Sequence, residues 1–175
     1  MKTTTELMRN GLYFGPLIAL NTLLEMTQNQ GLNFLSWGVW GVMMFLLYFF
    51  TNRYKKTSGI EELTFGKAFY YVTMTYIFGA LIATAINIIY FKWINPDTLT
   101  NYYDLLMPAF DQLPASQDKA EVKRIMQMLL QPVQMSFIYL WVYILQAVFY
   151  GLIFALITKG SVNKSQTPND DDDII

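Results

Sequence analysis

Three long stretches of the chain contain no charged residue and are rich in Phe, Tyr, Ile, Leu and Met: residues 34–50, 68–91 and 133–157. A helix needs about 20 mostly apolar residues to cross a hydrocarbon layer about 30 Å thick. The second and third stretches reach this length, and the first reaches it with its uncharged flanking residues. The pattern therefore predicts transmembrane helices over about residues 33–50, 68–91 and 133–158.

A fourth apolar stretch lies near the N-terminus. Its uncharged part, residues 10–24, is short for a span, but Arg9 and Glu25 flank it, and long charged side chains can reach the interface from such positions. Pro16 would kink a helix here. A signal peptide is a second interpretation, although no small-residue cleavage site follows, and a helix lying in the interface is a third. We favour a span over residues 7–26.

A more polar connection, residues 92–131, separates the last two spans. Asn95 and Pro96 predict a helix start, and this helix is expected to end at about residue 107, before Pro108. Ser116 would cap a second helix, which is amphipathic because four apolar side chains share one face: Val122, Ile125, Met126 and Leu129. The predicted fold class is an all-α membrane protein with four transmembrane helices and an extra amphipathic helical connection between spans three and four.

Two acidic features are interpreted as solvated surface. Aspartates recur every seven residues at Asp97, Asp104, Asp111 and Asp118. They could form a cation-binding ladder, but two prolines interrupt the helical phase, so we favour simple solvation. Residues 161–175 are polar, contain four consecutive aspartates at 170–173, and are expected to form a disordered cytoplasmic tail behind a membrane domain of residues 1–160.

The basic residues predict an orientation. With both termini in the cytoplasm, eight basic residues fall inside (Lys2, Arg9, Arg53, Lys55, Lys56, Lys67, Lys159 and Lys164) and four outside (Lys92, Lys119, Lys123 and Arg124). Positively charged loops stay on the cytoplasmic side, so we expect a multi-pass protein of the bacterial inner membrane with both termini cytoplasmic. If the first stretch does not span, the N-terminus lies outside. Trp37, Trp40 and Trp93 near the expected outer ends fit interfacial anchors.

Composition narrows the chemistry. Only 14% of the 175 residues are charged and 54% are hydrophobic, with no cysteine and no histidine. These absences exclude disulfides, thiolate nucleophiles, Cys/His zinc sites and Ser-His-Asp triads. A net charge of −1 argues against nucleic acid as a partner. No catalytic motif is present either, so we expect a protein that is not an enzyme and needs no cofactor or metal.

Polar residues inside the predicted spans are the remaining candidates for function. Eight fall in the half of the bilayer expected to face outward, among them Thr22 and Ser36. Six of the eight form the candidate cluster: Asn21, Glu25, Thr84, Asn87, Gln134 and Ser136. They could bridge helices by hydrogen bonds, which is the preferred interpretation. Alternatively, they could line an outward-facing cavity in which Glu25 is the ionisable group. A transport role would be favoured if four of these residues surround a cavity: Asn21, Glu25, Asn87 and Gln134. Direct contact among the same residues would favour a packing role.

Small residues at helical spacing predict close helix packing. Gly11 and Gly15 are four apart, Gly79 and Ala83 form a similar pair, and Gly38 and Gly41 are three apart. Such residues let helix backbones approach one another. The spacing alone does not distinguish packing within one chain from dimerisation.

Three segments of the chain resemble a family of small bacterial membrane proteins. They are GIEELTFGKAF at residues 59–69, AINIIYF at 85–91 and INPD at 94–97. This family is known as domain of unknown function four-one-nine-nine. The resemblance covers about residues 5–160 and implies a four-helix inner-membrane protein, with no ligand or catalytic residue to carry over.

The leading functional hypothesis from the sequence is a non-enzymatic membrane protein that acts through helix packing or through partners. Its expected partners are the lipid bilayer and a second copy or another membrane protein. The alternative is a small transporter or channel component with an outward-facing polar cavity.

Overall fold

The computed structural model describes residues 2–27, 30–57, 63–111 and 119–158, and these ranges contain helices and no strand. Four long helices are α1 (Lys2–Glu25), α2 (Gln30–Thr57), α3 (Phe65–Ile89) and α6 (Pro132–Thr158). A π-helical turn, η1 (Tyr90–Ile94), extends α3, and two shorter helices follow, α4 (Asp97–Asp111) and α5 (Lys119–Leu129). The predicted all-α class is thus confirmed for the described residues.

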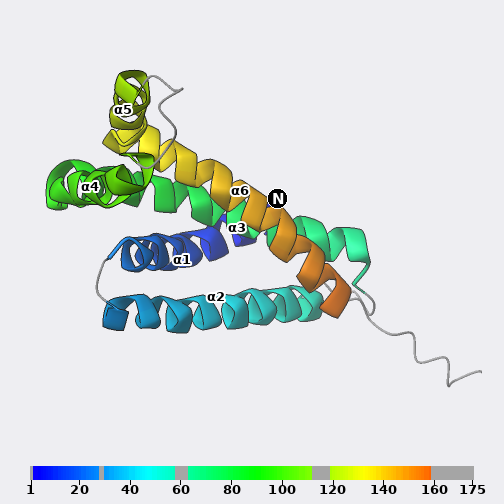
Figure 1. Cartoon of the computed structure of the whole chain (residues 1–175). Coiled ribbons are helices and arrows are strands. Elements are labelled where there is room, and N and C mark those ends of the chain that lie inside the picture. The colour runs from blue at the N-terminus through cyan, green and yellow to red at the C-terminus, as the bar shows by residue number, and fades with distance from the viewer. Residues whose placement is uncertain (1, 28–29, 58–62, 112–118, 159–175) are drawn as a thin grey trace, which may run out of the picture.

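The long helices form a bundle, and α4 and α5 lie together at one end of it (Figure 1). Helix α1 lies between α2 and α3, while α6 packs along α3. We call the end of the bundle that carries α4 and α5 the α4/α5 end. The C-terminus of α1 and the N-termini of α2 and α6 are also at this end (Figure 1).

Among the described residues, three helical segments are long and apolar enough to cross a membrane: Gln30–Lys56, Phe65–Ile94 and Pro132–Thr158. They correspond to three of the four predicted spans, and large side chains such as Phe34, Phe45 and Leu145 point away from the bundle. The fourth predicted span, residues 7–26, is a helix but is not among these segments. Its polar N-terminal turns lower its apolar content, so a four-span fold is not confirmed by length and composition.

Glycines set the closest helix contacts. A Cβ atom on Gly11 would lie 2.5 Å from the Cβ of Phe78, and one on Gly15 would lie 2.8 Å from the carbonyl oxygen of Gly79. The pair therefore brings α1 against α3 within one chain, which accounts for its spacing without dimerisation. Gly151 does the same for α6, because a Cβ there would run into Thr73 of α3.

Gly38 and Gly41 do not form a helix-packing pair within the described part of the chain. No described atom outside the local helix lies within 4 Å of a Cβ built on either residue. Both glycines are on an exposed face of α2, because α2 packs mainly on α1 and touches α3 and α6 little. Helices α2 and α6 approach each other at their C-terminal ends and diverge toward the α4/α5 end (Figure 1).

The connection differs from the prediction in one respect. Helix α4 runs through Pro108 to Asp111, although a helix end before this proline was expected. Proline removes one backbone hydrogen bond, and here that loss falls in the last turn, close to where the helix ends. The predicted cap Ser116, the last aspartate of the repeat (Asp118) and the tail of residues 161–175 lie outside the described residues.

Candidate ligand-binding cavity

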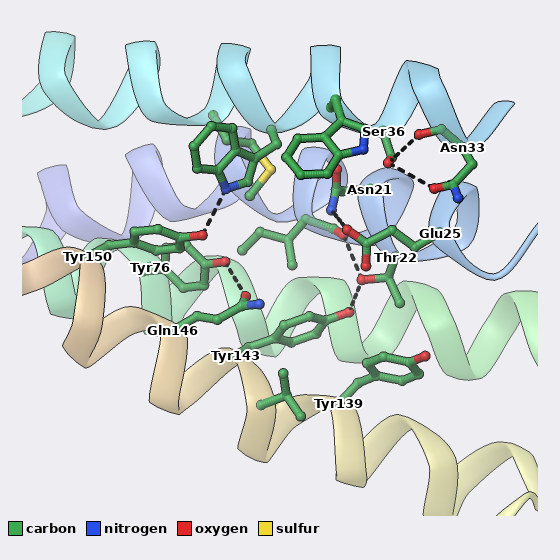
Figure 2. Close-up of a pocket in the computed structure, with 15 residues that line it drawn as sticks. Asn21, Thr22, Glu25, Asn33, Ser36, Tyr76, Tyr139, Tyr143, Gln146 and Tyr150 are labelled. Carbon is green, nitrogen blue, oxygen red and sulfur yellow. Dashed lines mark hydrogen bonds between the residues drawn. The ribbon is translucent and has the colours of Figure 1, made fainter. Parts of the chain in front are cut away.

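A cavity of about 450 Å³ lies between α1, α2, α3 and α6. It reaches from the α4/α5 end toward the middle of the bundle, in the space where α2 and α6 diverge (Figures 1 and 2). Its wall is both polar and aromatic, formed by Ile18, Asn21, Thr22, Glu25, Asn33, Ser36, Trp37, Trp40, Met43, Tyr76, Tyr139, Val142, Tyr143, Gln146 and Tyr150. Trp37 and Trp40 also remain exposed on the surface, so the cavity opens beside α2.

Amide and carboxylate groups form the part of the cavity nearest the α4/α5 end. The Nδ2 of Asn21 donates a hydrogen bond of 2.6 Å to Oε1 of Glu25, one helical turn further along α1. Across the cavity, the hydroxyl of Ser36 donates to the backbone carbonyl of Asn33 at 2.6 Å (Figure 2). Within the described part of the chain, no donor reaches the buried Oδ1 of Asn21.

A hydrogen-bonded chain crosses the bundle behind this region. Asn87, which is fully buried, donates from Nδ2 to the hydroxyl of Tyr143 at 3.0 Å. The hydroxyls of Tyr143 and Thr22 are 2.5 Å apart, and the hydroxyl of Thr22 is also within hydrogen-bond distance of the carbonyl of Ile18, at 3.1 Å. Either hydroxyl can be the donor between the two, because each is both a donor and an acceptor. The chain joins α3, α6 and α1, and Tyr143 and Thr22 face the cavity.

Two side-chain pairs form the deep end of the cavity. The indole Nε1 of Trp40 donates to the hydroxyl of Tyr150 at 2.9 Å and so links α2 to α6. The hydroxyl of Tyr76 donates to Oε1 of Gln146 at 2.8 Å, which links α3 to α6 (Figure 2). Met43 is also part of the wall here and belongs to the apolar core with the buried Leu47. The cavity therefore ends at packed side chains within the bundle.

The structure separates the six sequence candidates. Asn21 and Glu25 line the cavity, and the buried Asn87 contacts it through Tyr143. The hydroxyls of Thr84 and Ser136 instead donate to carbonyls four residues earlier in their own helices, at 2.8 and 2.7 Å. Gln134 is exposed and does not line the cavity. Of the four residues expected around a transport cavity, Asn21 and Glu25 line the cavity, Asn87 lies behind its wall, and Gln134 lies apart from it.

The sequence interpretation missed the aromatic part of the wall. Trp37 and Trp40 were interpreted as interfacial anchors, yet both line the cavity. Tyr76, Tyr143 and Tyr150 were not singled out, although phenolic hydroxyls deep inside an apolar span need hydrogen-bond partners. That need was the signal available in the sequence, and it leads to the amides of Gln146 and Asn87 for Tyr76 and Tyr143 and to the indole of Trp40 for Tyr150.

The apolar helices and the polar, aromatic cavity between them define a helical protein of the membrane type. The chain belongs to the family described as protein of unknown function DUF4199, whose model matches residues 9–159. This is the family that the segments at 59–69, 85–91 and 94–97 resemble, so the predicted membership is confirmed. No curated protein and no solved structure matches the chain significantly.

Proposed function

We propose that this protein is a small, non-enzymatic membrane transporter component that receives a solute in the cavity between α1, α2 and α6. One observation carries the proposal: a volume of about 450 Å³ with a carboxylate and several amides and hydroxyls lies among helices of membrane type. Polar groups inside a membrane are costly and usually mark a path or a site for a solute. Packing alone would leave no such volume, because helix interiors are normally filled.

The proposal includes α1 as a fourth transmembrane helix. Phe14, Ile18 and Ala19 of α1 are buried in the same apolar core as α3 and α6. On its other side, α1 exposes Leu12 and Tyr13, a pattern that suits contact with lipid. Because α1 runs alongside the spanning helix α3, its central turns share the depth of that helix in the bilayer.

The orientation in this proposal puts both termini in the cytoplasm of a bacterial cell and the α4/α5 end outside the inner membrane. Arg53, Lys55 and Lys56 lie in the last turns of α2, away from the α4/α5 end. Basic residues favour the cytoplasmic side, which supports an outward-facing cavity mouth.

A role in partner binding remains a second candidate because of the loose attachment of α2. This helix packs mainly on α1 and leaves Phe34 and Phe45 exposed at 79% and 65%. Such a face suits lipid, a second copy of the chain, or another membrane protein. This role and a solute cavity are compatible.

Cysteine accessibility tests the cavity directly, because the chain contains no cysteine. Val142→Cys places a thiol on the cavity wall, and Leu145→Cys places one on the outer face of the same helix α6. A membrane-impermeant methanethiosulfonate reacts with thiolates in water and not with thiols in lipid. We expect the Val142→Cys variant to be labelled in right-side-out vesicles and the Leu145→Cys variant to remain unlabelled.

Two further results decide between the candidates. If neither variant is labelled, the cavity is dry and the partner-binding role is favoured. If both are labelled equally, α6 does not lie in the membrane as proposed. Lys56→Cys serves as the orientation control, and it should react only in inverted vesicles.

A further inference from the structure

The charge of the cavity wall restricts what it can bind. Among the described residues that line the cavity, Glu25 is the one with a formal charge, and neither lysine nor arginine is present. Glu25 is exposed, and its charge attracts cations and repels anions that enter the cavity. An anionic solute would meet the carboxylate of Glu25 without a compensating cation, whereas a cationic solute would be attracted to it.

The carboxylate of Glu25 is the strongest hydrogen-bond acceptor on the cavity wall. Its Oε1 accepts a hydrogen bond of 2.6 Å from Nδ2 of Asn21. Glu25 is exposed, and a carboxylate offers about four lone-pair sites, so acceptor capacity remains. This carboxylate suits a solute that brings its own N–H donors.

Aromatic rings supply the second element of recognition. Trp37 and Trp40 line one side of the cavity, and Tyr139, Tyr143 and Tyr150 line the other. Faces of Trp and Tyr rings attract cations and also pack well against apolar groups. Ile18, Met43 and Val142 add apolar surface to the wall.

We infer that the solute is an organic ammonium ion with an apolar body, held with its ammonium group at Glu25 and its body between the tryptophans of α2, Trp37 and Trp40, and the tyrosines of α6, Tyr139 and Tyr143. This inference rests on the proposed function, since it names the class of solute for the same cavity. The carboxylate accepts the N–H donors of the ammonium, and the rings contact the carbon skeleton. A volume of about 450 Å³ accommodates an amine of moderate size, such as an arylalkylamine.

Tryptophan fluorescence provides the binding assay. The chain has four tryptophans, of which Trp37 and Trp40 line the cavity while Trp93 and Trp141 are exposed elsewhere. Replacing Trp93 and Trp141 by Phe leaves the cavity tryptophans as reporters in lipid nanodiscs. We expect a saturable fluorescence change with 2-phenylethylammonium, and no competition from 2-phenylethanol or phenylacetate at the same concentration.

Glu25→Gln should weaken the binding of 2-phenylethylammonium about 10- to 100-fold, the loss typical of a hydrogen bond to a charged group. Glu6→Gln is the matched control, because Glu6 is a carboxylate on the same helix that does not line the cavity. It should leave the affinity unchanged. Labelling of Val142→Cys is measured in the Glu25→Gln background to show that the cavity still forms.

The two proposals fail in distinguishable ways. Equal affinity for the alcohol and the ammonium probe, or unchanged affinity in Glu25→Gln, overturns the inference and leaves the cavity as a solute site. Absence of saturable binding by the ammonium probe while Val142→Cys is still labelled also overturns the inference. If the Val142→Cys variant with no other substitution is not labelled, the proposed function itself is overturned.

Discussion

Gly151→Ala probes the contact that holds α6 against α3. A Cβ atom at residue 151 would lie 3.1 Å from two ring carbons of Phe69 and still closer to the hydroxyl oxygen of Thr73. That hydroxyl donates to the carbonyl of Ala147, which is one turn before Gly151 on α6. The added methyl group therefore forces the two helices apart at a point where backbone and side chains are already in contact.

The expected cost follows from three contributions. Overpacking of this kind costs about 1–3 kcal/mol, and the weakened bond from Thr73 adds up to about 1 kcal/mol. Alanine is a better helix former than glycine by about 1 kcal/mol, which offsets part of the loss. We therefore expect a net destabilisation of about 1–2 kcal/mol, equivalent to a decrease in Tm of roughly 2–8 °C for a chain of this size.

Thermal unfolding in a mild detergent, followed by tryptophan fluorescence, measures the effect. Gly38→Ala is the matched control: it makes the same change in a spanning helix, where no described neighbour lies within 4 Å of the added Cβ. Its Tm should be equal to or above that of the original chain. Adding Thr73→Ala to Gly151→Ala removes the nearest obstructing atom and should recover part of the lost stability.

Two results would refute this reasoning. Equal Tm values for Gly151→Ala and Gly38→Ala would mean that α3 and α6 are not in close contact at this point. A double variant with Thr73→Ala that is no more stable than Gly151→Ala alone would mean that the obstruction is not at Thr73.

Two further substitutions test other contacts by the same measurement. Tyr143→Phe should lower the stability by about 1–3 kcal/mol, because it leaves a buried amide without its acceptor, whereas Tyr70→Phe on the exposed side of α3 should change it by less than about 0.5 kcal/mol. Gly15→Ala should have a net cost of up to about 2 kcal/mol, because its Cβ would lie 2.8 Å from the carbonyl oxygen of Gly79 and the better helix propensity of alanine offsets part of the overpacking. Gly41→Ala should cost nothing. A small effect of Tyr143→Phe, or equal effects of the two glycine substitutions, would contradict these contacts.

The spanning helices were predictable because the cost of placing charge in lipid removes charged residues from long stretches of sequence. This physical rule acts along the chain and needs no knowledge of neighbours. The sequence signal for a span was weaker in α1, because Lys2, Glu6 and Arg9 precede its apolar turns. Which side of each helix faces a neighbour was not predictable in the same way, because α3 and α6 are apolar on all sides.

The glycines illustrate this limit. Gly15 and Gly41 both belong to closely spaced pairs in apolar sequence, yet one touches α3 and the other faces outward. The same holds for the polar candidates. Asn21 and Glu25 are paired by their spacing of four residues, which is a local property, and both line the cavity. Gln134 carries a similar amide in a similar stretch, but its rotation around the helix axis leaves it exposed.

The position of α6 in the chain has a consequence for biosynthesis. Synthesis proceeds from the N-terminus, so α1, α2 and α3 are made before α6 exists, and helices of a membrane protein associate after insertion. Until α6 arrives, the amide of Asn87 lacks the hydroxyl of Tyr143 that accepts its hydrogen bond. A nascent chain at this stage also lacks the α6 wall of the cavity. Arrival of the last helix therefore supplies the hydrogen-bond acceptor of Asn87 and completes the cavity wall in a single step.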